Sequence, residues 1–139
     1  MWKYGCDYLH AATHILTLQL PHPFVPYYVL LGQSIELFLK TYLLQKGMKL
    51  TDLKKKFGHN LETLGACARE YGLQSIASLS SIQWAAINML GREYMGKRYQ
   101  YSHGGKTVVP TIQLVHDAAE VLRECTRILE CEIENANDA

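Results

Sequence analysis

The sequence predicts an all-α protein: an up-and-down bundle of four or five helices forming one domain of 139 residues. Apolar residues recur at helical spacing along nearly the whole chain, and prolines, glycines and capping residues divide this pattern into segments of helical length. A hydrophobic content of 48% is typical of a globular domain and excludes a wholly disordered chain. The only candidate strand is residues 107–109, and it is very short.

The first two helices are expected over residues 4–18 and 26–45. Three prolines between them form a stiff connector, and Gly47 ends the second helix. The second helix is apolar on most sides, so we expect it in the middle of the bundle. Its one polar stripe consists of three side chains that share a face, Gln33, Glu36 and Lys40.

A basic connector over residues 48–58 follows, with one short helical turn expected inside it. Asn60 is a good N-cap for a third helix, which Gly72 should end. The remaining boundaries are marked by residues that begin or end helices: Ser80 or Ser81 for the fourth helix, and Pro110 and about Cys131 for the last.

Charge is unevenly distributed along a chain whose net charge is only +1, from 14 basic and 13 acidic residues. Residues 40–59 hold six lysines and one aspartate, a net charge of +5, and residues 92–106 have a net charge of +3. Residues 117–139 carry seven acidic and two basic side chains, a net charge of −5. The near-neutral total excludes binding of nucleic acid by bulk attraction, so any such binding requires a local basic patch.

The composition also predicts a compartment. The four cysteines form no C-x-x-C motif and no dense disulfide framework, so they are expected to be reduced thiols, as in the cytoplasm. The first residues have no secretion signal, and the longest apolar stretch, residues 24–31, is too short to span a bilayer. We therefore expect a cytoplasmic protein with no membrane partner.

A metal site is one interpretation of Cys6, His10 and His14, which share a face of the first helix at four-residue spacing. Zinc normally needs a fourth ligand, often from another element, and the chain has no H-E-x-x-H motif. One flank of an amphipathic helix explains the stripe equally well. We expect no metal and no other cofactor.

The segment from residue 96 to residue 106 carries the strongest functional pattern. It combines cations, two tyrosines and a histidine, and two glycines follow the histidine. A histidine can move a proton near neutral pH, and an arginine can stabilise a charged phosphate in a transition state. Arg98 and His103 are therefore the candidate catalytic residues for metal-free RNA cleavage, and the alternative is a loop histidine and a solvated arginine without a catalytic role. The candidate substrate-binding residues are Lys97, Tyr99, Lys106, Glu36 and Lys40.

Three segments in this order resemble a HEPN domain (higher eukaryotes and prokaryotes nucleotide-binding). Residues 33–40 resemble the Q-x-x-E-x-x-x-K pattern of its second helix, and residues 58–61 resemble its H-[DN]-L signature. Arg98 through His103 follow as R-x(4–6)-H before a long final helix. The resemblance covers about residues 25–125.

The resemblance implies a four- or five-helix bundle that forms a homodimer, in which Arg98 and His103 of two protomers share one cleft. It implies a metal-independent endoribonuclease of bacterial defence, encoded beside a nucleotidyltransferase antitoxin. Cleaving relatives usually carry a polar residue where this chain has Tyr99. The alternatives are therefore a noncatalytic nucleotide- or RNA-binding module, or a dimerisation domain.

Two motif residues also have a purely structural interpretation. Glu36 and Lys40 are spaced for an i, i+4 ion pair, whereas the functional alternative is that they line the cleft and orient Arg98. For His59 we favour a capping role near the third helix over a catalytic one.

Overall fold

The computed structural model describes residues 1–95 and 111–138, and every regular element in that part of the chain is helical. The predicted all-α class is confirmed there. The candidate strand at residues 107–109 lies outside the described residues. The elements in chain order are α1 (Trp2–Ile15), α2 (Phe24–Gln45), α3 (Leu50–Phe57), α4 (Leu61–Glu70), the 3₁₀ turn η1 (Leu73–Ser75), α5 (Ser81–Leu90), the π-helical turn η2 (Gly91–Met95) and α6 (Ile112–Asp138).

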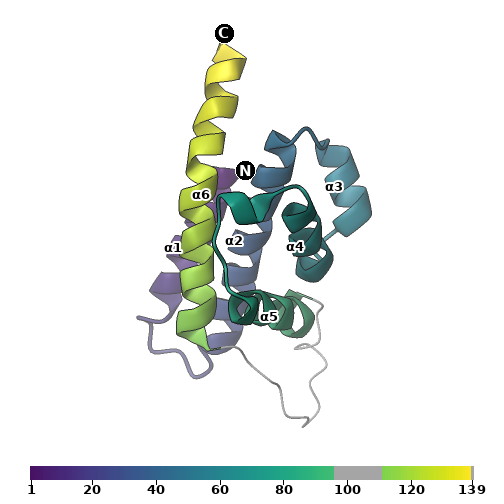
Figure 1. The fold of residues 1–139 in the computed structure, drawn as a ribbon. Helices are drawn as coiled ribbons and strands as arrows, with labels where there is room; N and C mark the ends of the chain where they lie inside the picture. Colours follow the sequence, from purple (N-terminus) through teal and green to yellow (C-terminus); the bar gives the residue numbers. More distant parts are fainter. Residues whose placement is uncertain (96–110, 139) are drawn as a thin grey trace.

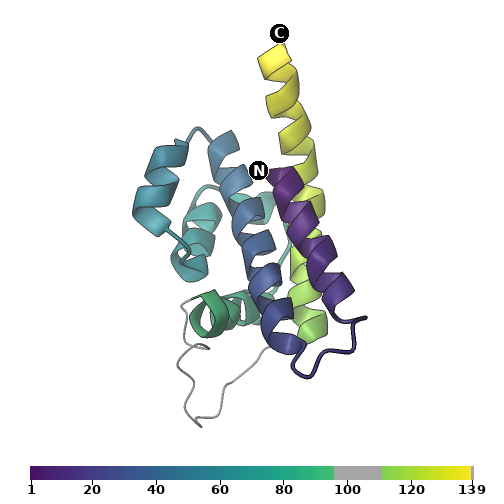
Figure 2. The ribbon, with the colours of Figure 1, turned by 180° about the vertical axis from the view of Figure 1, so that it is seen from behind.

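Helix α2 lies in the middle of the bundle, as its apolar composition predicts. Helices α1 and α6 pack on one side of it and α4 on the other (Figures 1 and 2). Thirteen residues of α2 are buried, among them Leu31, Ile35, Phe38 and Leu39. A helix surrounded in this way must be apolar on nearly every face, so any charged residue that it carries in the core needs a partner there.

The sequence predicted a connector with one helical turn over residues 48–58, and this prediction is wrong about helix α3. The structure instead has an eight-residue helix beside α4, outside the central bundle (Figure 1). Leu53 and Phe57, four positions apart, are both buried and fix one face of α3 to the protein. Half of the eight residues of α3 are charged, and these charges obscure its short apolar pattern, which is why the helix was underestimated.

The predicted N-caps at Asn60 and Ser80 are confirmed, while several helix ends differ from the predicted boundaries. The Asn60 side chain accepts a hydrogen bond from the Thr63 backbone N–H, and Ser80 forms a capping box with Gln83. Helix α1 ends three residues before the predicted boundary at residue 18, and α6 continues beyond Cys131. The last turns of α6 extend past the other helices (Figure 2).

Close packing between α1 and α2 depends on Gly5. A Cβ atom at this position would lie 2.7 Å from a ring carbon of Phe38, which is fully buried. The carbonyl oxygen of Gly5 also accepts a hydrogen bond of 2.7 Å from the Ser34 hydroxyl of α2. The backbone of α1 therefore lies directly against α2.

Within residues 1–95 and 111–138, no helix combines the length and the apolar character that crossing a bilayer requires.

Candidate functional site

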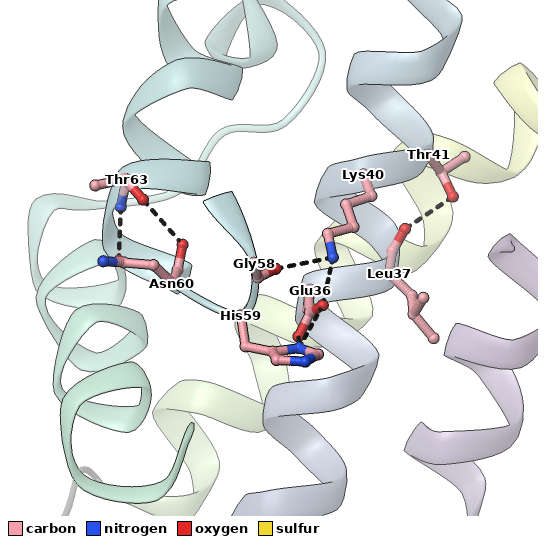
Figure 3. A network of polar contacts seen from close by, with 8 residues as sticks. All are labelled: Glu36, Leu37, Lys40, Thr41, Gly58, His59, Asn60 and Thr63. Atoms are coloured by element: carbon pink, nitrogen blue, oxygen red, sulfur yellow. Dashed lines mark hydrogen bonds and ion pairs between the residues drawn. The ribbon is translucent and has the colours of Figure 1, made fainter. Parts of the chain in front are cut away.

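A buried polar network joins the middle of α2 to the turn between α3 and α4 (Figure 3). Lys40 donates a hydrogen bond of 2.5 Å to Oε1 of Glu36, one helical turn earlier, and one of 3.0 Å to the carbonyl oxygen of Gly58. Nδ1 of His59 lies 3.0 Å from each carboxylate oxygen of Glu36. The network therefore connects two segments that carry the HEPN resemblance, residues 33–40 and 58–61.

Burial makes this network energetically important. The side chains of Glu36 and Lys40 are only 3% and 8% exposed. A buried carboxylate or ammonium without a partner is strongly destabilising, whereas a pair with further hydrogen bonds compensates much of the desolvation cost. Here the ammonium has two oxygen acceptors and the carboxylate has two donors. The predicted i, i+4 ion pair between Glu36 and Lys40 is confirmed.

The turn before α4 presents the Gly58 carbonyl oxygen and the His59 imidazole to α2 because Gly58 adopts φ +53° and ψ −116°. Side-chain-bearing residues rarely adopt this conformation, so glycine is required for a turn that points its carbonyl oxygen at Lys40. The imidazole of His59 then lies against Glu36 from the solvent side.

His59 has a different partner from the one that the sequence suggested. The cap of α4 is Asn60, and His59 contacts Glu36 instead, so its interpretation as a capping residue is wrong. A carboxylate can only accept hydrogen bonds, so Nδ1 is the protonated nitrogen. In the neutral ring Nε2 then carries the lone pair. The side chain is 68% exposed, so this geometry provides an oriented imidazole at the surface.

The predicted catalytic pair cannot be placed in this site. Arg98 and His103, and the predicted substrate-binding residues Lys97, Tyr99 and Lys106, lie outside the described residues. The part of the site that the structure does describe is Glu36, Lys40 and His59. Sequence reasoning named all three but did not join His59 to Glu36.

The three residues of the possible metal site on α1, Cys6, His10 and His14, do not share one pocket. Cys6 and His10 line a pocket of about 420 Å³ between α1 and α6, together with His116, Glu120 and Arg123, while His14 does not line it. Among the described residues, no group of three or more His, Cys, Asp or Glu side chains is arranged to hold a metal ion. Burial raises the pKa of the Cys6 thiol, although nearby Arg123 opposes that shift. A raised pKa disfavours the thiolate form that metals require.

Comparisons of the chain with protein-family models, with curated proteins and with solved structures returned no match.

Proposed function

We propose that this protein acts on RNA as a HEPN-type, metal-independent endoribonuclease of a bacterial defence or toxin–antitoxin system, with a composite active site in a homodimer. The observation that supports the proposal most is the contact of His59 with Glu36, the carboxylate that also accepts a hydrogen bond from Lys40. Glu36 and His59 are 23 positions apart in the chain, belong to two sequence patterns that resemble one family, and meet in one network. Such a meeting is expected if the patterns belong to one structural unit.

The chemistry assigned to Arg98 and His103 needs no metal. His103 takes the proton from a ribose 2′-OH, whose oxygen attacks the adjacent phosphorus. The bond from phosphorus to O2′ forms as the bond to O5′ breaks, and a protonated imidazole returns a proton to O5′. The products are a 2′,3′-cyclic phosphate and a 5′-hydroxyl end. Arg98 stabilises the charge that develops on the phosphate oxygens.

The network at Glu36 has a positioning role in this scheme. It holds α2 against the start of α4 and leaves its own charges paired. We therefore place Glu36 and Lys40 in the framework of the cleft, and the chemistry at Arg98 and His103.

The test is cleavage of single-stranded RNA in the presence of EDTA. Wild-type protein should cleave, and Arg98→Ala and His103→Ala should each reduce the rate by at least about a hundredfold. Arg92→Ala and His22→Ala change the same residue types at exposed positions and should cleave normally. Cleavage that survives Arg98→Ala or His103→Ala, or a wild-type protein that cleaves no RNA, would overturn the proposal.

The second candidate is a noncatalytic RNA- or nucleotide-binding or dimerisation module that partners a nucleotidyltransferase. It is favoured by the complete internal pairing of Glu36 and Lys40, which a purely structural role explains. As a binding module it predicts salt-sensitive RNA binding without cleavage. As a dimerisation module it predicts a dimer by light scattering with no nucleotide affinity. A monomer at micromolar concentration would contradict both the dimerisation role and the composite cleft.

A further inference from the structure

A second candidate site lies at the far end of α2 from its proline connector, where α2, α3 and the end of α4 meet. A pocket of about 630 Å³ opens there. Its lining consists of four lysines, one aspartate, one tyrosine and the connector between α2 and α3: Lys46, Lys49, Lys55, Lys56, Asp52, Tyr71, Gly47 and Met48. This volume is within the range of about 300–1,000 Å³ that is typical of small-molecule sites.

The pocket is strongly electropositive. Its lining charges are four ammonium groups and one carboxylate, a net charge of +3. Within the part of the chain that the structure describes, none of the four lysines forms an ion pair. Lys46 lies 5.4 Å from the ring centroid of Tyr42, and Lys56 lies 5.5 Å from that of Phe57. Unpaired ammonium groups gathered around a concave surface favour an anionic ligand.

The helix ends at the pocket are compatible with an anion. The C-terminal carbonyls of α2 would repel one, but backbone N–H groups already cap them: Lys46 donates to Tyr42, Gly47 to Leu44 and Met48 to Leu43. The N-terminus of α3 begins at the pocket edge, and the side chain of its N-cap, Lys49, makes no capping hydrogen bond. The first-turn N–H groups of α3 therefore add a partial positive charge at the pocket edge beside Lys49, in the same turn as the carboxylate of Asp52.

Tyr71 gives the pocket an aromatic wall. Its backbone carbonyl oxygen accepts a hydrogen bond of 2.6 Å from the hydroxyl of Tyr42, a fully buried residue of α2. This bond fixes the end of α4 at the pocket, while the Tyr71 side chain stays 47% exposed. An exposed tyrosine beside lysines can stack on a base while the cations hold phosphates.

We propose that this pocket binds a nucleoside 5′-triphosphate group, with Lys46, Lys49, Lys55 and Lys56 around the phosphates and Tyr71 against the base. The group has two sources, a free nucleotide or the 5′-triphosphate end of an RNA. The site is distinct from the network at Glu36 and contains neither Arg98 nor His103. Its occupancy therefore does not require RNA cleavage.

The primary measurement is isothermal titration calorimetry of the full chain with ATP in EDTA. Saturable binding with a dissociation constant below about 1 mM is expected, and AMP should bind at least about tenfold more weakly because it presents fewer charges. Absence of ATP binding, or equal affinities for ATP and AMP, would overturn the proposal. A 5′-triphosphate and a 5′-hydroxyl oligonucleotide of one sequence distinguish the two sources.

In that arm, stronger binding of the triphosphorylated oligonucleotide than of ATP identifies an RNA end as the ligand, and weaker binding identifies the free nucleotide. Equal affinity of the two oligonucleotides, together with displacement of ATP by the 5′-hydroxyl form, would show ordinary backbone binding and overturn the assignment of a triphosphate site.

Neighbouring lysines of α3 supply a matched control. Lys55 lines the pocket and Lys54 does not, although both are exposed on the same helix. Lys55→Gln should weaken ATP binding by about tenfold, whereas Lys54→Gln should leave it within about twofold. Equal losses in the two variants would indicate a general charge effect and contradict the site.

Two further variants separate binding from folding. Asp52→Asn removes the one carboxylate of the pocket and should tighten ATP binding by several-fold, an effect that damage to the fold would not produce. Tyr71→Leu should weaken binding of ATP but not of inorganic tripolyphosphate, whereas Tyr4→Leu, at an exposed position of α1, should change neither. Unchanged ATP affinity in both Asp52→Asn and Tyr71→Leu would contradict the proposed pose.

Discussion

Glu36 and His59 lie 23 positions apart in the chain, yet Nδ1 of His59 is 3.0 Å from both carboxylate oxygens of Glu36. The contact crosses from the central helix to the turn before α4. It places an exposed imidazole on a carboxylate that is itself almost completely buried. One side chain therefore acts both as a core charge and as an anchor for a surface residue.

The first prediction concerns the buried pair Glu36 and Lys40. Glu36→Gln leaves a buried ammonium without a countercharge and should reduce the free energy of unfolding by about 3–5 kcal/mol. Lys40→Met should also destabilise the protein. The loss of unfolding free energy in the double variant should be smaller than the sum of the two single losses by at least about 1 kcal/mol. Urea denaturation followed by circular dichroism measures all three variants.

The matched control is the exposed pair of Arg92 and Glu62, whose nitrogen and oxygen are 3.4 Å apart. Glu62→Gln should change the free energy of unfolding by less than about 1 kcal/mol. Strict additivity of Glu36→Gln and Lys40→Met would show that the two side chains do not stabilise each other.

The second prediction concerns stability at high pH. Burial, followed by the nearby Tyr28 and Asp117, raises the pKa of Tyr27 to about 12, from an ordinary value of 10. The unfolded chain therefore loses this proton first as the pH rises, so stability is fully present below pH 10 and is lost between about pH 10 and 12. The loss should be about 2–3 kcal/mol.

Denaturation curves at several pH values between 9 and 12 measure this loss, and Tyr27→Phe is the control. The variant cannot ionise at this position, so its stability should fall less steeply over the same interval. Parallel pH profiles for the two proteins would contradict the assignment to Tyr27.

The third prediction concerns Gly5. Gly5→Ala places a methyl group 2.7 Å from the buried ring of Phe38, and the overpacking should destabilise the protein by about 1–3 kcal/mol despite the better helix propensity of alanine. Thermal unfolding measures the effect. Adding Phe38→Leu should make the Gly5→Ala change less costly, and an unchanged cost in that background would exclude this steric mechanism.

The fourth prediction concerns thiol reactivity. Burial raises the pKa of the thiols of Cys6, Cys67 and Cys125. In a Cys131→Ser background these three should react with iodoacetamide at pH 7.5 more slowly than free cysteine, and at the free rate once urea has unfolded the chain. Reaction at the rate of free cysteine in the folded protein would refute this expectation.

Patterns within single helices explain what the sequence predicted well. The central place of α2 follows from its apolar residues on nearly every face, and the start of α4 follows from Asn60, whose capping needs only a local hydrogen bond. The Glu36 and Lys40 pair was predictable for the same reason, because the two residues are one helical turn apart.

Contacts between distant segments explain what was missed. The partner of His59 depends on how the turn at Gly58 packs against α2, and no local pattern encodes that packing. The lysines around the pocket were recognised as a basic segment. Their arrangement with Tyr71 depends on the position of α4, which only the tertiary structure provides.

The pairing of Lys40 also affects the electrostatic field of the molecule at long range. Because Glu36 neutralises it in the interior, the positive field of residues 40–59 comes from the lysines near α3. Helix α6 lies on the other side of α2 (Figure 1). Its Glu120 and Glu124 pair with Arg123 and Arg127, but residues 117–139 as a whole have a net charge of −5. This separation gives the molecule an electric dipole moment, which would turn its α3 side toward a polyanion during diffusional approach, before any contact is made.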